Sequence, residues 1–107
     1  MIHNVNAGEN DGWTALMLTA YYNHLDMGVS LMNHPGIDLN VQDRWNNWTA
    51  LHLAVLNNHP AIVSQLLSDD KIDASLKDNH NNYTALKIAI DSGRAECVTI
   101  LRQHGAP

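Results

Sequence analysis

Apolar positions in the middle of the chain form two short runs with the spacing of amphipathic helices. The first run, 51–56, follows Thr49, a residue that favours the N-cap position of a helix. The second run begins with Pro60 and places its apolar residues at i, i+1, i+4 and i+5, as one buried helix face requires. Asn58 lies between the runs and readily takes the left-handed conformation that ends a helix. The pattern therefore predicts two antiparallel helices joined by a tight turn.

A different pattern follows this helix pair. Side chains alternate between apolar and polar over 72–77, which is typical of an extended segment. The polar cluster 78–82 then favours a tight turn, and its last residue, Asn82, tolerates a positive φ angle. Asn47 and Gly12 precede an aromatic residue in the same way elsewhere in the chain. One unit is therefore an extended finger with a tight turn, then a helix, a turn and a second helix.

The same unit occurs three times with a period of 35 residues. The tetrapeptide Trp-Thr-Ala-Leu at 13–16 returns at 48–51 and, with tyrosine first, at 83–86. Such a fixed period indicates stacked supersecondary units, each of which buries a face that it cannot bury alone. We expect a single domain over 1–107 with repeats at about 1–39, 40–74 and 75–107, either by itself or within a longer array.

The repeat closely resembles the ankyrin repeat. The resemblance rests on Thr-Ala-Leu-His-Leu-Ala at 49–54, Asn-His-Pro-Ala-Ile-Val at 58–63 and Ile-Asp-Leu-Asn-Val-Gln-Asp at 37–43. It implies an all-α ankyrin-repeat solenoid of helix-turn-helix units with projecting β-hairpin fingers. In such a solenoid the first helices line a concave face and the second helices form the back. His52 occupies the place of a family histidine that forms a hydrogen bond within the turn.

The resemblance also implies a function, which is noncatalytic binding of another protein through the finger tips and the concave helix face. Position by position, it selects candidate contact residues, which include all six aromatic residues of the chain. Trp and Tyr are the residue types most enriched at interface hot spots. The candidates are Asn10, Asp11, Trp13, Tyr21 and Tyr22 in the first repeat, Arg44, Trp45, Asn46, Trp48, Leu56 and Asn57 in the second, and Asn79, His80, Asn81, Tyr83, Asp91 and Ser92 in the third.

Some of these aromatic residues have a second interpretation. Trp13, Trp48 and Tyr83 stand at equivalent positions, so they either contact a partner or pack along the stack and stiffen the fingers. Trp45 has no aromatic counterpart in the other repeats and lies among Arg and Asn, which favours a contact role. One of the tyrosines at 21–22 is also suited to covering the open N-terminal side.

Composition narrows the class of partner. The net charge is −5, and no basic stripe is present to bind phosphates, so we expect no nucleic-acid partner. The apolar stretches are too short to span a bilayer, and residues 1–10 lack the basic start and apolar run of a signal peptide. A single cysteine fits a reducing compartment. Together these features favour a cytoplasmic, intracellular protein without a membrane partner.

The residue pattern gives little reason to expect a catalytic site or a metal site. Of the seven histidines, no two stand at i, i+4 on one helix face, and no Cys-x-x-Cys occurs, so we expect no metal and no cofactor. Cys97 falls at the position of Met27 and Ile62, which makes it a core residue rather than a nucleophile. A nucleophile, a base and an oxyanion site are not grouped, so we expect no enzyme activity.

The two ends of the stack are expected to differ. Gly28 replaces the valine of the other repeats and weakens its helix by about 1 kcal/mol; together with Ser30 it is expected to give the N-terminal end a polar outer face. At the C-terminal end an apolar group has no following repeat: Cys97, Val98, Ile100 and Leu101. We therefore expect neighbouring repeats or a homo-oligomer to cover the C-terminal end. Self-assembly through open repeat ends is the alternative function.

Overall fold

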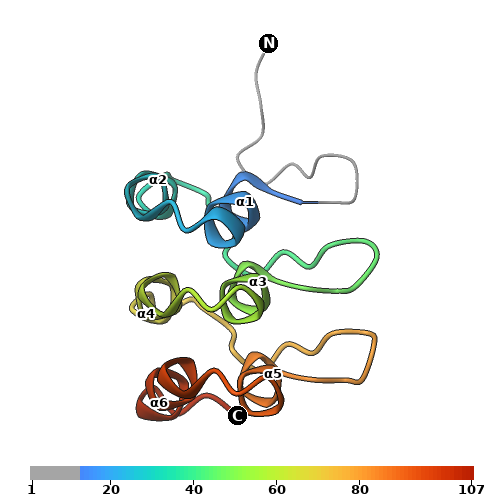
Figure 1. Cartoon of the computed structure of the whole chain (residues 1–107). Coiled ribbons are helices and arrows are strands. Elements are labelled where there is room, and N and C mark those ends of the chain that lie inside the picture. The colour runs from blue at the N-terminus through green and yellow to red at the C-terminus, as the bar shows by residue number, and fades with distance from the viewer. Residues whose placement is uncertain (1–12) are drawn as a thin grey trace.

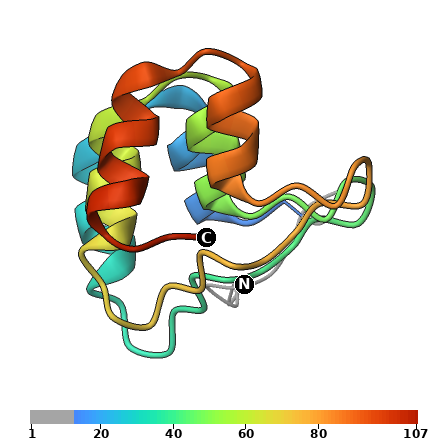
Figure 2. The ribbon, with the colours of Figure 1, turned by 90° about the horizontal axis from the view of Figure 1, so that it is seen from below.

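Residues 13–107 are described by a computed structural model, and in this part of the chain six helices form three stacked pairs (Figure 1). In the second and third pairs the first helix lies next to a projecting finger, and the second helix lies on the opposite side, as Figures 1 and 2 show. The pairs are α1 (Ala15–Tyr22) with α2 (Leu25–Met32), α3 (Ala50–Leu56) with α4 (Pro60–Leu67), and α5 (Ala85–Asp91) with α6 (Ala95–Gln103). This arrangement confirms the predicted helix-turn-helix units.

Each first helix has a threonine as its N-cap residue. The hydroxyl groups of Thr14, Thr49 and Thr84 accept a hydrogen bond of 3.2–3.3 Å from the backbone N–H three residues later. His52 completes a capping box, because its Nδ1 accepts the Thr49 N–H at 3.2 Å. The Nε2–H of the same ring donates to the Tyr83 carbonyl in the next repeat at 3.1 Å. The hydrogen-bonding role expected of His52 is therefore confirmed, and the ring also links two repeats.

Residues with positive φ angles make the turns that the sequence predicts. Left-handed residues between the paired helices have φ angles of 62°, 58° and 70°; these are Asn23, Asn58 and Gly93. In the fingers, Asn47 and Asn82 have φ angles of 53° and 56°, directly before the aromatic residues. Gly12, the third predicted finger position, lies outside the described residues.

The fingers of the second and third repeats fold back as loops, as predicted, but neither contains paired strands. One backbone hydrogen bond closes each loop, from Asp43 N–H to Trp48 O at 2.8 Å and from Asp78 N–H to Tyr83 O at 2.9 Å. Other N–H groups inside the loops bond to the aspartate side chains rather than to a facing strand. The carboxylates thus replace the hydrogen-bond ladder that a β-hairpin would use.

One continuous core runs through the stack, and the middle repeat is at its centre. The helical residues of that repeat, 50–67, include no charged side chain. Apart from its alanines, six of its apolar side chains are at most 2% exposed: Leu51, Leu53, Val55, Ile62, Val63 and Leu66. Cys97 lies fully buried in the same core, as predicted, and burial raises the pKa of its thiol. None of the helices described combines the length and the apolar character that a membrane-spanning helix needs.

The structure reverses the prediction about the two ends of the stack. The C-terminal group is largely covered, since Cys97 and Leu101 are fully buried and Val98 and Ile100 are half-buried. The exposed apolar side chains instead gather on the first repeat, where six are at least 38% exposed: Leu18, Tyr21, Tyr22, Leu25, Met27 and Val29. The sequence pattern failed here because it does not show which face of each helix pair points toward the next repeat.

Gly28 has a different role from the one predicted. It is buried, and a Cβ atom there would clash with the Gln65 carboxamide. The Gln65 side chain crosses this position to donate from Nε2 to the Leu25 carbonyl at 3.0 Å. Gly28 therefore makes room for a hydrogen bond between α2 and α4 and does not form part of a polar outer face.

The pH dependence of stability tests the burial of His52. Burial lowers the pKa of this imidazole, and the hydrogen bond to Tyr83 and the charges of Asp78 and Asp43 only partly oppose that effect. The unfolded chain, in which histidine has a pKa of about 6.5, then binds the proton more readily than the folded chain. Stability that is present above this pH should be lost as the pH falls below it toward the folded pKa.

We expect a lower free energy of unfolding at pH 5.5 than at pH 7.5, measured by urea denaturation. Asp73, Asp78 and Asp91 do not titrate in this window, because the pKa of each is lowered from about 3.8. The difference between the two pH values should shrink in His52→Gln. A variant that keeps the full difference would show that another group causes it.

Candidate functional site

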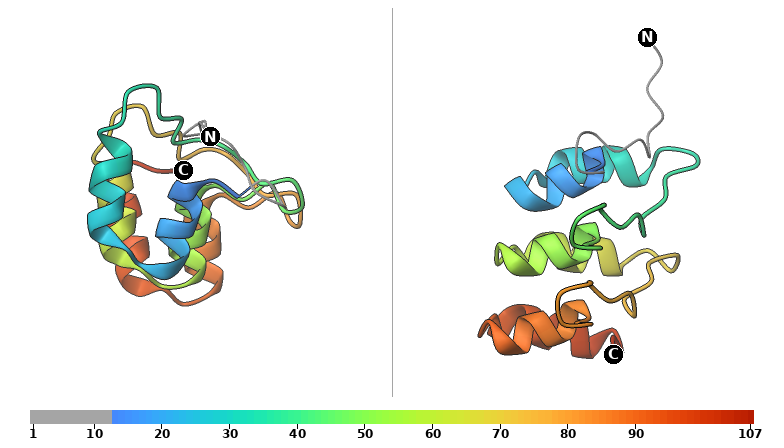
Figure 3. Two further views of the ribbon diagram at one scale, coloured as in Figure 1. Left: turned by 90° about the horizontal axis from the view of Figure 1, so that it is seen from above. Right: turned by 90° about the vertical axis from the view of Figure 1, so that its right-hand side faces the viewer.

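The candidate surface consists of the finger tips of the second and third repeats and the adjoining sides of α3 and α5. Figure 3 shows these two fingers one above the other along the stack. The loops that form them, 43–48 and 78–83, occupy equivalent positions in their repeats. The surface is therefore assembled from two consecutive repeats, and its geometry depends on how they stack.

Asp43 organises the second finger. Its side chain is 1% exposed, and its Oδ1 accepts hydrogen bonds from the N–H groups of Asn46 at 3.0 Å and Trp48 at 2.9 Å. The other oxygen, Oδ2, accepts the indole N–H of Trp13 at 2.9 Å. Hydrogen bonds to a buried carboxylate are stronger than those between neutral groups. They fix the loop and connect it to the first repeat.

Asp78 plays the same part in the third finger. Its Oδ1 accepts hydrogen bonds from the N–H groups of Asn81 at 3.2 Å and Tyr83 at 3.1 Å. Burial alone would raise the pKa of Asp78, but these hydrogen bonds, with help from the nearby Trp48 indole and His52, outweigh burial and lower it. The carboxylate therefore remains charged and holds the loop at neutral pH.

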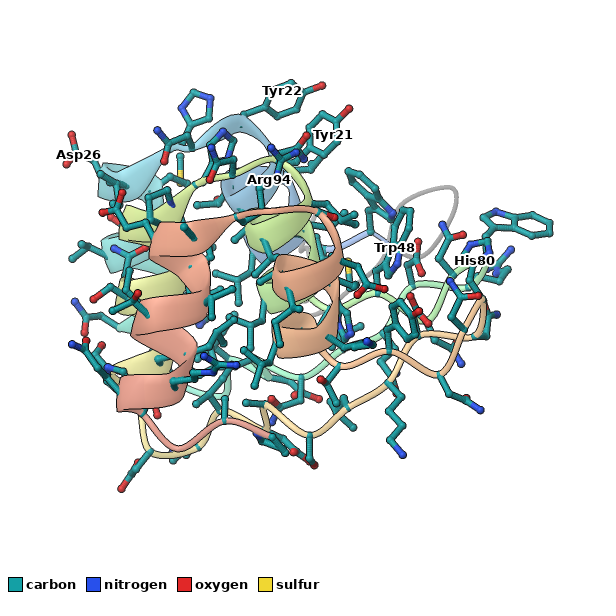
Figure 4. The ribbon with its side chains drawn as sticks, turned by 60° about the horizontal axis from the view of Figure 1, so that its bottom comes forward. Tyr21, Tyr22, Asp26, Trp48, His80 and Arg94 are labelled. Atoms are coloured by element: carbon teal, nitrogen blue, oxygen red, sulfur yellow. The ribbon has the colours of Figure 1, made fainter. Side chains whose placement is uncertain are left out.

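The two fingers are also bonded to each other. The backbone N–H of Asn79 donates to the Asn46 carbonyl, and its side-chain Nδ2 donates to the Trp45 carbonyl, both at 3.0 Å. The His80 ring donates from Nε2 to the Asn46 side chain, and its centroid lies 5.8 Å from that of Trp48 (Figure 4). The tips therefore form one connected surface rather than two independent loops.

A groove of about 240 Å³ lies between the third finger and the helices α3 and α5. Seven of the residues selected from the sequence meet in it, and they are joined by two that were not selected, Asp78 and Ile88. The seven are Trp48, Leu56, His80, Asn81, Tyr83, Asp91 and Ser92. The groove combines apolar walls with a few polar groups, which is the usual character of a recognition site.

The Trp48 indole places a buried hydrogen-bond donor at the wall of this groove. The equivalent indole, that of Trp13, is bonded to Asp43, whereas Trp48 Nε1–H is buried and has no hydrogen-bond partner within residues 13–107. It lies close enough to Asp78 to help lower the pKa of that carboxyl, but the two do not reach hydrogen-bond geometry. A buried donor without a partner is costly, so an acceptor supplied by a ligand would be favourable here.

One wall of the groove carries an ordered group of polar side chains. The Tyr83 hydroxyl lies beside the Asp91 carboxylate, and the interaction between them lowers the pKa of Asp91 and raises that of Tyr83. Lys87 Nζ lies 3.2 Å from Asp91 Oδ1 and 5.5 Å from the centroid of the Tyr83 ring. The Lys87–Asp91 ion pair is exposed to solvent, so it contributes little to stability.

The other residues selected from the sequence lie in separate parts of the structure. Arg44, Trp45 and Asn79 are exposed at the finger tips, and Trp45 is 62% exposed. Asn46 and Asn57 are half-buried, and the side chain of Asn57 donates to the Leu53 carbonyl at 3.3 Å. Tyr21 and Tyr22 lie at the end of α1, away from the groove (Figure 4), and Asn10 and Asp11 lie outside the described residues.

Trp13 is better explained by packing than by partner contact. Its indole is bonded to Asp43 of the next repeat, and its ring centroid lies 5.2 Å from that of Tyr21. The two aspartates at the base of the fingers, Asp43 and Asp78, were not selected from the sequence as site residues. Their signal was the recurrence of an aspartate at the 35-residue period within a turn.

Other kinds of site are not formed by the described residues. Within 13–107, no group of three or more His, Cys, Asp or Glu side chains is placed to hold a metal ion. In the comparison with protein families, the model "Ankyrin repeats (3 copies)" matches residues 1–78 and 30–107, which together span the whole chain. No curated protein matches the sequence.

Replacing Asp43 tests its role at the base of the finger. Asp43→Ala should lower the free energy of unfolding by about 2 kcal/mol or more, because it leaves three N–H donors without their acceptor. Urea denaturation followed by tryptophan fluorescence measures the loss. Asp70→Ala is the matched control, since Asp70 is exposed in the loop after α4, and it should change stability by less than about 0.5 kcal/mol. Equal losses in the two variants would contradict the assignment.

Proposed function

Because the chain belongs to the ankyrin repeat family, whose repeats are generally protein–protein interaction modules, we propose that it binds a partner protein without catalysis. The binding surface is the groove between α3, α5 and the third finger, together with the two finger tips. The observation that carries the proposal is the groove itself, in which residues from two repeats meet around an unpaired indole donor.

Rigidity supports this assignment. The hydrogen bonds that Asp43 and Asp78 accept, and those between Asn79 and the second finger, hold the contact residues in place before a partner arrives. Ordering of interface side chains costs about 0.5–1.5 kcal/mol for each flexible side chain, and a preorganised surface avoids part of that cost. The fold therefore suits recognition of a partner by a fixed surface.

The groove also indicates which chemistry the partner supplies. Its apolar wall includes Leu56 and Ile88, and its donor is the indole of Trp48. A partner segment that places one apolar side chain against this wall and a carbonyl or carboxylate oxygen near the indole satisfies both.

Trp45 is the proposed anchor at the finger tip. Its side chain is 62% exposed, and its backbone carbonyl is held by the Asn79 side chain at 3.0 Å. Burial of an exposed tryptophan at the centre of an interface commonly contributes about 2 kcal/mol or more on truncation to alanine. We further propose a cytoplasmic location, which the single free cysteine, Cys97, supports.

Partner capture from the native source tests the proposed surface. The immobilised protein and its Trp45→Ala variant are incubated with lysate, and retained proteins are quantified by mass spectrometry. Trp45→Ala should reduce retention of the specific partner about tenfold or more, because it removes an anchor of about 2 kcal/mol. Its melting temperature should stay close to that of the wild type, since the side chain lies outside the core.

Tyr22→Ala is the matched control in this experiment. Tyr22 is 61% exposed, nearly the same as Trp45, but it lies at the end of α1 rather than at the finger tips. Its removal should leave retention of the partner nearly unchanged. Retention that is insensitive to Trp45→Ala, or that falls equally in both variants, would contradict the assignment of this surface.

A further inference from the structure

The N-terminal end of the stack presents an apolar face with a hollow of about 350 Å³. We call it the N-terminal face and define it by the residues that line the hollow: Ala15, Leu18, Thr19, Tyr22, His24 and Met27. Three of its large side chains are exposed to an unusual degree, with Leu18 at 41%, Met27 at 54% and Tyr22 at 61%. Contiguous exposed apolar surface of this kind commonly marks an interaction site.

The same positions are covered in the other two repeats. The counterparts of Ala15, Leu18 and Met27 pack against the preceding repeat and are at most 6% exposed: Ala50, Leu53, Ile62, Ala85, Ile88 and Cys97. The N-terminal face therefore has the same apolar positions as the surfaces that are buried between consecutive repeats. It has the character of a surface that another helix pair covers.

The polar position of this face follows the same pattern. His59 donates from Nδ1 to the Ala20 carbonyl of the preceding repeat at 2.9 Å, and Arg94 donates from Nη2 to the Leu56 carbonyl at 3.0 Å. His24 occupies the equivalent position and forms no such hydrogen bond within residues 13–107; its ring lies 6.2 Å from that of Tyr22. At this end of the stack, both the apolar positions and the polar position that face a preceding repeat elsewhere therefore have no neighbouring repeat among the described residues.

The opposite, C-terminal end of the stack presents charged side chains to solvent. Lys87 and Arg102 stand where the first repeat has Met17 and Met32, and both charged side chains are exposed. A terminal repeat needs such a polar outer face to stay soluble. In contrast, Asp26 is the single charged residue in the helices of the first repeat, 15–32, and it lies at the edge away from Tyr22 (Figure 4).

These observations decide between ways of covering the N-terminal face with a second copy. Head-to-tail stacking would place Lys87 and Arg102 of one copy against the apolar face of the other. Removal of charged groups from water is costly even where, as for Lys87 and Asp91, they form an ion pair. Pairing of two N-terminal faces instead sets apolar surface against apolar surface. An isologous contact of this kind is closed and does not lead to open filaments.

We propose that the N-terminal face is a homodimer interface, in which two copies of this chain pair through the same face about a two-fold axis. The face offers an exposed ring, Tyr22, beside the hollow that it helps to line, and a self-complementary contact needs both. Ring centroids 5.2 Å apart for Trp13 and Tyr21 and 4.9 Å apart for Tyr21 and Tyr22 support that ring from behind. The dimer leaves the groove and the finger tips free, so it presents two copies of the partner-binding surface.

Sedimentation equilibrium of the full chain over a wide range of concentrations tests the proposal. The wild type should change from the monomer mass of 11.9 kDa to twice that mass as its concentration rises. Leu18→Glu should raise the dimer dissociation constant at least about a hundredfold, because it buries a charge in the interface. Ile90→Glu is the matched control: Ile90 is 43% exposed, against 41% for Leu18, and lies on the last repeat. This control should dimerise like the wild type.

A second variant keeps the test valid if Leu18→Glu loses helical signal in circular dichroism. Met27→Glu changes a side chain that is 54% exposed, so the fold should tolerate it while the dimer dissociates. A folded Met27→Glu variant that still dimerises would overturn the proposal. So would a wild type that is monomeric at every concentration, which would leave the face to another polypeptide. Oligomers larger than dimers that Ile90→Glu also dissolves would show head-to-tail stacking, and would overturn it as well.

Discussion

The seam between consecutive repeats is the constraint on which the rest of the structure depends. No single helix pair of this chain is able to bury both of its apolar faces, so each gains most of its stability from its neighbours. The middle repeat shows this best, because its apolar helix residues are almost fully buried and its helices include no charged residue. Its two faces lie against the first and third repeats, which in turn leave one face each without a neighbour among the described residues.

Polar links across the seam fix the repeats in register. His52 reaches the Tyr83 carbonyl, His59 reaches the Ala20 carbonyl, and Arg94 reaches the Leu56 carbonyl. Each donor satisfies a carbonyl of a neighbouring repeat, so a shift of one repeat against the next would break several bonds at once. This register places the third finger over the second and brings residues of α3 and α5 into one groove. The recognition surface is thus a consequence of the stacking, not of any one repeat.

Local signals in the sequence predicted most of the fold. Thr49 and its counterparts begin the first helices, Pro60 begins a second helix, and Asn58 takes the left-handed turn, because each of these preferences acts over a few residues. The role of Gly28 was not predictable in this way, since it depends on the Gln65 side chain of the next repeat. The missing strand pairing has a similar cause, because the Asp43 carboxylate takes N–H groups that a facing strand would have used.

The candidate site was predictable only in part. The resemblance of the repeat selected most of the residues that line the groove. It did not show that Trp13 is bonded to Asp43, while Trp48 Nε1–H has no acceptor among the described residues. That difference arises from the relative placement of neighbouring repeats. The exposed face at the N-terminal end was missed for the same reason, because equal positions in three repeats become unequal only when the stack has ends.

Amide hydrogen exchange of the wild type, measured by NMR at a concentration low enough to keep the chain monomeric, tests the central role of the seam most directly. We expect the slowest exchange in α3 and α4, because their repeat is covered on both sides, and faster exchange in the helix pairs on either side. Slower exchange in α1 and α2 or in α5 and α6 than in the middle pair would contradict it. So would equal protection of all three pairs at a level below that of global unfolding, because each pair would then be stable without its neighbours.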